Sequence, residues 1–398
     1  MKILIVHNDY GKYSGEEAIV DRMIDDGRRF GYEIKTLRRT SKFSRDSWTG
    51  KIHGFFSGIF SISGRRMMRK ALEEFRPDIV HIHNLYPFIS PAVLFLCKRR
   101  GFPVVMTVHN YRLICPTGLF LRDGKACENC LHNVNERDCI KYNCENNRFR
   151  SLGYALRNMV ARRTGAYMKC VDYFCCLTSF QKQKLIEAGF NSEKIWIFPN
   201  YVEYIEPEKD TNGSPKCNYV GYVGRLSKEK GYDLLFEVAK RHPEIQFRFA
   251  GSIRDDMKEN LPANVELCGI LNKQQLAQFY VNSRFIVIPS RCYEGFPVVL
   301  LEASSHAKAC IAPNHGAFPD LMHERETYRL GGLLFKPLDT DDLERKITEL
   351  WNDKEKADRL GTIAEQNYKK RFLKQNLNVA WDRFLRRIAA NHKANHIN

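Results

Sequence analysis

The sequence predicts an α/β protein with two domains, and three features of the chain support this expectation. Its 398 residues, 43% of them apolar, are enough for two separate hydrophobic cores. Short apolar, β-branched runs alternate with amphipathic stretches, as expected for parallel strands joined by helices. A polar stretch at 206–216 separates two such series of elements and predicts the linker between the domains.

The first series, residues 1–205, begins with an apolar strand at 2–7, a glycine-containing loop and an amphipathic helix that ends near Gly31. The later elements repeat this order of strand and helix. The further strands are expected at 32–37, 77–84, 103–109, 171–178 and 194–202, and helices at 90–101 and 179–190.

The second series, residues 206–370, has the same alternation. Its strands are expected up to Gly224 and at 247–251, 265–270 and 285–288, and one of its helices at 272–284. The remaining residues, 371–398, carry an apolar stripe at helical spacing opposite lysines and arginines, and predict a final amphipathic helix.

The stretch 289–321 predicts a phosphate site. A loop ending at Gly295-Phe296-Pro297 follows a buried strand, and a helix is expected to begin there, with Pro297 at its first position. The backbone N–H groups of Phe296 and Val298, on either side of Pro297, then belong to a helix N-terminus, where they attract an anion above the sheet.

Two carboxylates, Glu294 and Glu302, bracket this helix start. Eight helical residues rise about 12 Å, which is wider than the roughly 5–9.5 Å between the carboxyl groups of a glycoside-hydrolysing pair. The two groups are better placed to hold vicinal hydroxyls at two ends of one elongated ligand. Two exposed helix charges are the alternative.

A second loop carries two cations beside a glycine. Gly224 ends a strand and lets a ligand approach the backbone, and Arg225 and Lys230 offer a planar fork and a point charge suited to a diphosphate. Gly251 ends the next strand of the series. Such a loop can also be merely solvated, so the assignment needs further support.

That support comes from a resemblance. Four segments of the chain resemble the retaining glycosyltransferases of family 4. They are EGFPVVLLEAS at 294–304, GRLSKEKG at 224–231, TVHNYRLICP at 107–116 and RPDIVHIHNLYPFISPAVL at 76–94. The resemblance implies the GT-B architecture, in which two Rossmann-like domains with parallel sheets face a central cleft. It also implies that the helix at 371–398 crosses back to the first domain.

The resemblance further implies roles for individual residues. Glu294 contacts hydroxyls of the donor sugar, and Glu302 contacts the ribose of the nucleotide. His109, at the C-terminal end of its strand, contacts the donor sugar, although a lone histidine there is often structural. Gly15 matches a glycine loop close to the donor sugar and the acceptor.

The implied reaction moves a sugar from a UDP- or GDP-sugar to an acceptor hydroxyl with retention of configuration. The acceptor attacks from the face that the nucleotide leaves, and a β-phosphate oxygen takes its proton. Arg225, Lys230 and the helix N-terminus stabilise the departing diphosphate, and no cofactor is expected in catalysis. A nucleotide-sugar 2-epimerase of the same fold and a non-catalytic basic binding protein are the alternatives.

Five of the thirteen cysteines lie in a turn-rich insertion at 115–144. The Cys-x-x-Cys spacing of two of them is typical of a structural zinc site, and four thiolates close such a site. Free thiols or a redox pair are the alternatives. The candidate ligands are Cys115, Cys127, Cys130 and Cys144, with Cys139 as the alternative fourth ligand.

A formal net charge of +17 suggests a polyanionic partner. Residues 35–70 contain ten Lys or Arg and one acidic residue, interleaved with Phe and Met. This composition favours an anionic membrane surface over nucleic acid, although a packed core with a solvated basic face is an alternative. The chain has no run of eighteen apolar residues. We therefore expect a cytoplasmic protein, peripheral on the membrane, that meets a lipid-linked saccharide acceptor.

Overall fold

The computed structural model describes residues 1–10, 15–41, 48–133, 136–207, 218–252, 261–322 and 330–397. The chain forms two compact units. Unit 1 comprises 1–120, 128–199 and 378–398, and unit 2 comprises 121–127 and 200–377. The chain therefore passes between the units at 199/200, six residues before the predicted boundary, and most of the predicted linker lies outside the described residues.

Unit 1 is built on a six-stranded sheet in the order β2-β1-β3-β4-β7-β8, and every neighbouring pair is parallel. The α/β class predicted from the sequence is confirmed for this unit. The strands are β1 (Lys2–Asp9), β2 (Glu33–Thr40), β3 (Ile79–Asn84), β4 (Val104–Val108), β7 (Tyr173–Cys176) and β8 (Ile195–Ile197).

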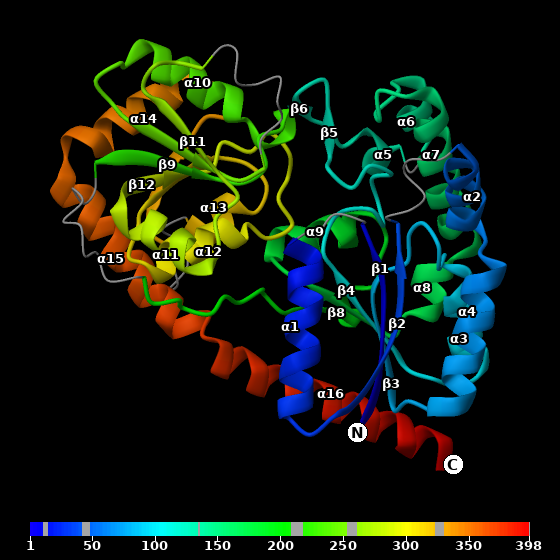
Figure 1. Ribbon diagram of the computed structural model, residues 1–398. Coiled ribbons are helices and arrows are strands. Elements are labelled where there is room, and N and C mark those ends of the chain that lie inside the picture. Colours follow the sequence, from blue (N-terminus) through cyan, green and yellow to red (C-terminus); the bar gives the residue numbers. More distant parts are fainter. Residues whose placement is uncertain are drawn as a thin grey trace. The chain divides into compact units, whose positions relative to one another are not determined.

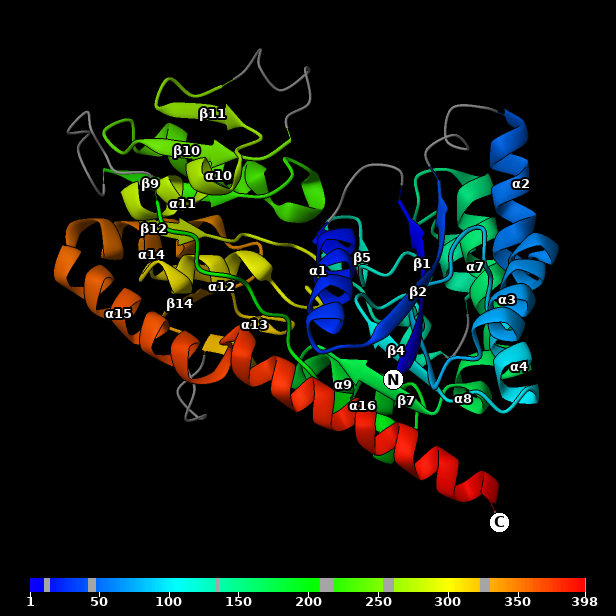
Figure 2. The same cartoon turned by 60° about the horizontal axis from the view of Figure 1, so that its bottom comes forward.

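Helices cover both faces of this sheet (Figures 1 and 2). The helices of the unit are α1 (Gly15–Arg29), α2 (Trp48–Ile59), α3 (Ile62–Phe75), α4 (Ala92–Arg99), α5 (Asn129–His132), α6 (Arg137–Lys141), α7 (Arg148–Thr164), α8 (Ala166–Cys170) and α9 (Ser179–Glu187). A short 3-10 turn, η1 (Ser192–Lys194), precedes β8.

The last helix, α16 (Lys374–Ile397), packs on the sheet of unit 1 beside α1 (Figure 2). Its Phe384, Leu385 and Ile388 are buried in one cluster with Val20 and Ile24 of α1 and with residues of β1, β3, β4 and β7. The apolar stripe seen in the sequence is therefore the face that the helix buries.

Unit 2 has a second parallel six-stranded sheet, in the order β11-β10-β9-β12-β13-β14. The first strand of the unit, β9, lies in the middle of this sheet between β10 and β12. The crossover connections place β10 and β11 on one side of β9 and the later strands on the other. The strands are β9 (Tyr219–Val223), β10 (Phe247–Ala250), β11 (Val265–Gly269), β12 (Ser283–Val287), β13 (Cys310–Pro313) and β14 (Gly332–Phe335).

The helices of unit 2 also flank both faces of their sheet (Figure 1). They are η2 (Lys228–Lys230), α10 (Tyr232–Arg241), α11 (Lys273–Asn282), α12 (Val298–Ser305), α13 (Phe318–Met322), α14 (Thr340–Asn352) and α15 (Lys354–Arg371). A small antiparallel hairpin, β5 (Leu121–Arg122) and β6 (Lys125–Ala126), belongs to this unit too.

Local sequence explains where several helices begin. Asn272 caps α11 through its side chain, which accepts the N–H of Gln275, while the Gln275 side chain accepts the N–H of Asn272. Thr178 and Asp339 cap α9 and α14 in the simpler way, each accepting one N–H of the first turn. These caps satisfy donors that the helix itself leaves without partners.

Candidate active site

Three neighbouring strands of unit 2 deliver the predicted donor-site residues to one edge of the sheet. Gly224 and Arg225 follow β9, Gly251 follows β10, and Glu294 lies in the loop after β12. Because all three strands are parallel, their carboxyl ends meet on the same side, where ligands bind in open α/β sheets. The topology thus gathers residues that lie up to 70 positions apart.

Lys230 and Glu294 form an ion pair at this edge. Lys230 Nζ lies 2.7 Å from Glu294 Oε1, and the Ser290 hydroxyl donates to the same oxygen at 2.5 Å. Burial opposes the charge on Glu294, but Lys230 and the two hydrogen bonds outweigh it, so the pKa of Glu294 is held below its usual value. The Glu294 carboxylate therefore stays ionised. It pairs with Lys230, which the sequence analysis assigned to the diphosphate, whereas Glu294 itself was assigned to the sugar.

Arg225 is more open than Lys230. Its side chain is 67% exposed, and its guanidinium lies 3.2 Å from the carboxylate of Glu229. The backbone carbonyl of Arg225 accepts the Tyr222 hydroxyl at 2.7 Å, which fixes the loop directly after β9. Because the backbone of Arg225 is fixed and its guanidinium is exposed, the side chain can bind an anionic ligand with little effect on the free energy of folding.

Two glycines of this edge are required by close backbone contacts. At Gly251, which has φ +148°, an added Cβ would lie 1.9 Å from the Gly224 carbonyl oxygen. At Gly231, which has φ +70°, it would lie 1.9 Å from the Pro289 carbonyl oxygen. Only glycine fits such contacts and such φ values, so the loops after β9, β10 and β12 pack backbone against backbone.

The helix predicted after Gly295 is α12, and its start differs by one residue from the prediction. Pro297 has φ −77° and ψ 92° and stands at the N-cap position, so the helix begins at Val298 and not at the proline. Its ring fixes φ, but its extended ψ keeps it outside the helix. Phe296 is buried, which anchors the turn into the helix.

Glu302 lies within α12, in the second turn. Its Oε2 accepts the hydroxyl of the buried Tyr280 at 2.8 Å, a contact from α11 that the sequence did not predict. His306 Nδ1 lies 2.8 Å from the Glu302 backbone carbonyl oxygen. Glu294 and Glu302 therefore have separate partners, Lys230 for the first and Tyr280 for the second.

In unit 1, His109 follows β4 and belongs to a row of histidines. His109 Nε2 lies 2.8 Å from His83 Nδ1, and His81 Nε2 lies 2.8 Å from the Thr107 hydroxyl. His81 and His83 are both buried on β3. Since residues i and i+2 of a strand share one face, the spacing of His81 and His83 could have signalled this row.

We expect these buried histidines to make unit 1 acid-sensitive. Burial lowers the pKa of His81 to about 3 and also lowers the pKa values of His83 and His109. At acidic pH these histidines bind protons in the unfolded chain but stay neutral in the folded chain. The free energy of unfolding therefore falls as the pH drops below about 6.5, the pKa of histidine in the unfolded chain. Each histidine contributes about 1.4 kcal/mol per pH unit in that window.

Denaturant unfolding at pH 7, 6 and 5 measures this dependence. His81→Asn, which removes one of these buried imidazoles, should reduce the slope of the unfolding free energy with pH. Equal slopes in the parent chain and in His81→Asn would show that His81 is not one of the groups responsible.

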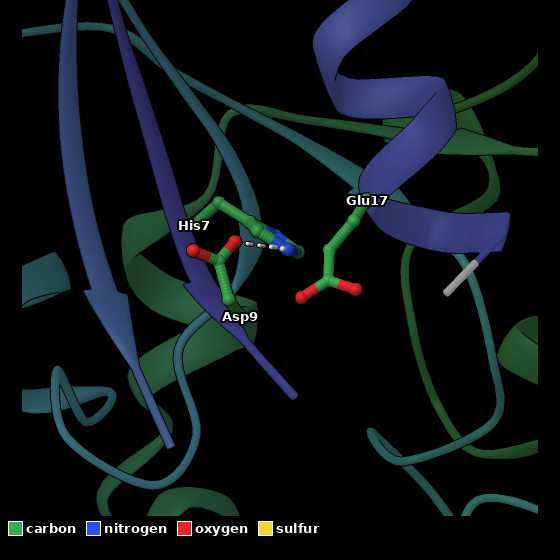
Figure 3. A group of neighbouring side chains, drawn as sticks. All are labelled: His7, Asp9 and Glu17. Atoms are coloured by element: carbon green, nitrogen blue, oxygen red, sulfur yellow. Dashed lines mark ion pairs between the residues drawn. The ribbon is translucent and has the colours of Figure 1, made fainter. Parts of the chain in front are cut away.

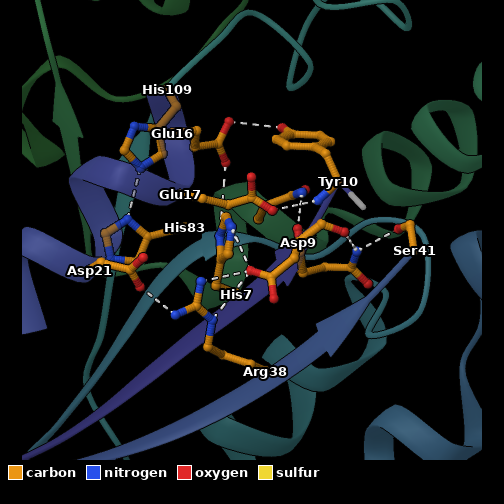
Figure 4. Close-up of polar contacts among 12 residues, drawn as sticks. His7, Asp9, Tyr10, Glu16, Glu17, Asp21, Arg38, Ser41, His83 and His109 are labelled. Carbon is orange, nitrogen blue, oxygen red and sulfur yellow. Dashed lines mark hydrogen bonds and ion pairs between the residues drawn. The ribbon is translucent and has the colours of Figure 1, made fainter. Parts of the chain in front are cut away.

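A polar cluster that the sequence did not predict lies beside this row. His7 and Asp9 at the end of β1 and Glu17 in the first turn of α1 point toward one another (Figure 3). Arg38 of β2 bonds to Asp9 at 2.8 Å and to Asp21 at 2.5 Å (Figure 4). The contacts join residues of three elements, which is why spacing along the sequence gave no signal.

Gly15 is the first residue of α1, next to this cluster. An added Cβ there would meet no described atom within 4 Å, so nothing described inside the protein requires glycine at this position. The neighbouring Glu16 accepts the Tyr10 hydroxyl at 2.8 Å, and Arg112 donates to the same hydroxyl at 2.9 Å.

The structure brings together three cysteines of the insertion. Cys130, Cys139 and Cys144 pack with Ala155 of α7. Cys139, predicted only as an alternative ligand, is thus a buried member of the group, because α6 packs on α7. Within the described residues no three thiols come within 4.8 Å of one another, and Cys115 and Cys127 lie outside the packed group. A zinc site at these cysteines stays a prediction.

The fold matches solved structures of sugar-transferring enzymes. Sucrose-phosphate synthase from Thermosynechococcus elongatus aligns with a TM-score of 0.74 at 15% identity, over 98% of this chain and 99% of that one. Anabaena Alr3699/HepE, solved with UDP and glucose, aligns with a TM-score of 0.66 at 15% identity, over 97% and 99%. This likeness shows the fold, which is the GT-B architecture with one parallel six-stranded sheet in each of two α/β units.

Two family models divide the chain between them. The model described as "Glycosyltransferase Family 4" matches residues 39–204, and that described as "Glycosyl transferases group 1" matches residues 205–367. The chain belongs to the group 1, or family 4, glycosyltransferases, which are retaining hexosyltransferases, and the predicted family is confirmed. Members of this family typically need no metal for catalysis.

Curated relatives extend the comparison. The sulfoquinovosyl transferase SQD2 of Arabidopsis thaliana is 31% identical over 198 residues, which are 48% of this chain and 38% of that protein, so the match spans less than half of that relative. The O-antigen chain mannosyltransferase C of Escherichia coli is 22% identical over 94% of both chains.

Proposed function

We propose that this chain transfers a sugar from a UDP- or GDP-sugar to a hydroxyl of a lipid-linked saccharide, at the cytoplasmic face of an anionic membrane, during synthesis of a cell-surface polysaccharide. The observation that carries the acceptor part of this proposal is a hollow of about 550 Å³ between α2 and α3 of unit 1. Its residues are Arg39, His53, Phe56, Ser57, Phe60, Ser61, Ile62, Ser63, Arg66 and Met67.

The hollow combines exposed apolar side chains with cations. Phe56 is 64% exposed, Ile62 63% and Phe60 49%. Arg65 lies over the Phe60 ring at 5.2 Å, and the exposed Arg66 borders the same hollow. Apolar side chains beneath cations suit a lipid chain below an anionic headgroup.

One aromatic residue of the predicted membrane segment has a different role. Phe55 stacks on Phe149 of α7 with ring centroids 4.8 Å apart, and its ring leaves no room for a side chain at Gly153. Phe55 therefore holds α2 against α7, whereas Phe56 turns to the solvent. Residues 42–47 of the predicted segment lie outside the described residues.

The donor chemistry follows from the edge of the second sheet. Arg225, Lys230 and the backbone N–H groups of Phe296 and Val298, on either side of Pro297, are proposed to stabilise the charge on the departing diphosphate. Glu294 is proposed to hold hydroxyls of the sugar, and Glu302 to hold the ribose. Glycines at 224, 251 and 295 let the backbone approach the nucleotide.

Two residues of unit 1 complete the proposed set. His109 is proposed to contact the donor sugar as a neutral imidazole, because burial lowers its pKa. Gly15 is proposed to leave space for the sugar or the acceptor, in keeping with the absence of any described atom near its added Cβ. The acceptor proton passes to a donor phosphate oxygen, so no side chain has to serve as a base.

The names of relatives support a surface polysaccharide as the product. An O-antigen chain mannosyltransferase matches almost the whole chain, and two further relatives are described as proteins in the cps region of Klebsiella pneumoniae. Within the described residues no helix is long and apolar enough to cross a bilayer.

A donor assay tests the catalytic proposal. UDP-, GDP- and ADP-sugars are incubated with the chain and a lipid-linked saccharide, and nucleotide release and acceptor mass are followed. Release coupled to a heavier acceptor supports transfer with the proposed acceptor. An isomerised nucleotide sugar would indicate the epimerase, and absence of turnover with every donor would indicate a binding protein.

The membrane proposal predicts binding to anionic vesicles. The parent chain should sediment with vesicles that contain anionic lipid and be released by high salt, because each cation near the surface contributes about 1 kcal/mol. Ile62→Ser with Arg66→Glu, two exposed positions one turn apart on α3, should lower the vesicle-bound fraction at least tenfold.

The matched control is Val379→Ser with Arg383→Glu on α16. It makes the same chemical changes at two exposed positions with the same spacing, away from the hollow, and should sediment like the parent. Equal losses in both variants would mean that only net charge matters. Binding of single-stranded RNA with a steep salt dependence, without vesicle binding, would overturn the membrane proposal.

A further inference from the structure

The cluster of His7, Asp9 and Glu17 combines three ligand types at one point of unit 1. Their candidate ligand atoms, one from each side chain, all lie within 4.8 Å of one another. His7 and Asp9 are two residues apart on β1 and so share one face of the strand, while Glu17 comes from the first turn of α1 (Figure 3). The three side chains meet where the strand ends and the helix begins.

His7 supplies the independent observation that something belongs there. Its side chain is completely buried, and neither ring nitrogen has a hydrogen-bond partner among the described residues. Nε2 lies 3.4 Å from Asp9 Oδ1, and Nδ1 lies 3.9 Å from Glu16 Oε1, both too far for good hydrogen bonds. Burying a polar group without a partner usually destabilises the folded state by about 1–3 kcal/mol. A ligand that binds His7 would explain why its ring nitrogens are buried in this way.

The charges around the cluster favour a divalent cation. Four carboxylates belong to the network, those of Asp9, Glu16, Glu17 and Asp21, and the guanidinium of Arg38 bonds to two of them (Figure 4). A second guanidinium, that of Arg112, donates to the Tyr10 hydroxyl at 2.9 Å. Among these described side chains two negative charges remain in excess, which equals the charge of one divalent ion.

The ligand chemistry narrows the kind of ion. One imidazole nitrogen and two carboxylate oxygens suit first-row divalent ions such as Mn²⁺ and Zn²⁺. Metal–ligand bonds of about 2.0–2.2 Å place ligand atoms about 3–4 Å apart, a small contraction from the separations in the cluster. Arg38 occupies one Asp9 oxygen, Oδ1, through its Nε and Nη2 atoms, so the second oxygen of Asp9 is the one suited to the ion.

We propose that His7, Asp9 and Glu17 bind a divalent first-row metal ion that ties the end of β1 to the first turn of α1. The ion has a structural role and takes no part in sugar transfer, in keeping with a family that typically works without a catalytic metal. It would hold Glu17 in place, whose Oε1 also accepts the Tyr10 N–H at 2.9 Å, and so fix the entry into α1. This proposal is independent of the proposed acceptor and membrane.

Manganese is the probe of choice, because thiolates bind it weakly and the cysteines of the insertion then contribute little signal. The full chain is freed of metal with a chelator and titrated with Mn²⁺, and bound ion is measured by electron paramagnetic resonance. We expect one Mn²⁺ per chain and an unfolding midpoint that rises with Mn²⁺ concentration.

Asp9→Asn and Asp21→Asn form a matched pair. Both remove one negative charge from the same Arg38 network, but only Asp9 is a proposed ligand. Asp9→Asn should weaken Mn²⁺ binding at least tenfold and abolish the rise in midpoint, whereas Asp21→Asn should change affinity less than threefold. Glu17→Gln, which keeps an acceptor for the Tyr10 N–H, should behave like Asp9→Asn and serves if that variant does not fold.

Two results would overturn the proposal. The first is a parent chain that binds no Mn²⁺ in a saturable way up to millimolar concentration. The second is an equal loss of affinity in Asp9→Asn and Asp21→Asn, because ions would then respond to the net charge of the network and not to a ligand set.

Discussion

Replacing Arg225 with alanine should lower kcat/KM for the nucleotide-sugar donor about 10²- to 10³-fold, the usual effect of removing one preorganised charge from a transition state. The head group of Arg225 is mostly exposed, and its ion pair with Glu229 is screened by solvent, so the variant should keep the stability of the parent. Steady-state kinetics and thermal unfolding of the same preparation measure both effects.

Lys228→Ala is the matched control for this prediction. It removes one cation from an exposed position of the same loop, three residues from Arg225, and should keep kcat/KM within about threefold of the parent. If Arg225→Ala and Lys228→Ala have equal kcat/KM values, Arg225 does not act on the diphosphate.

Lys230→Ala should show the same loss of kcat/KM, and unlike Arg225→Ala it should also destabilise the protein. Because Lys230 is the ion-pair partner of Glu294, its removal leaves a half-buried carboxylate without its cation. We therefore expect a loss of about 1–3 kcal/mol in the free energy of unfolding as well.

The second large effect is expected at the two carboxylates, and it should divide between turnover and binding. Glu294→Gln should lower kcat about 10²-fold and leave the affinity for free nucleotide nearly unchanged, because this residue is proposed to hold the sugar. Glu302→Ala should weaken nucleotide binding about tenfold to a hundredfold, as expected for the loss of a charged hydrogen bond. Calorimetric titration with UDP and GDP separates the two effects.

Tyr280→Phe completes this experiment. It removes the 2.8 Å hydrogen bond to Glu302 while leaving the carboxylate in place, so it should weaken nucleotide binding less than Glu302→Ala does. Equal losses of free-nucleotide affinity in Glu294→Gln and Glu302→Ala would contradict the division of roles between the two carboxylates.

The sequence by itself determined the α/β class, the positions of most strands and those of several helices, because alternation of apolar runs and amphipathic stretches is a local property. It also marked the loops after β9 and β12, since glycine, proline and charged residues directly after an apolar run identify a strand end. It identified the family through the sequence motifs around Arg225, Lys230 and Glu294, and the family models confirm that assignment.

Only the tertiary structure decided which of these residues touch. Lys230 and Glu294 are 64 residues apart and form an ion pair because β9 and β12 are neighbours in the sheet. Strand order sets such contacts, and a single sequence does not display it. The hydrogen bond from Tyr280 to Glu302 arises in the same way, between two successive crossover helices.

Exposure, too, was decided by neighbours distant in the sequence. Phe55 and Phe56 are adjacent and chemically identical, yet α7 covers one and leaves the other in the solvent. His7 looks in the sequence like any polar residue at the end of a strand, and becomes a candidate ligand only because α1 brings Glu17 to it and the sheet buries its ring. Periodicity predicts which face of an element is apolar, but what covers that face depends on the packing of the whole unit.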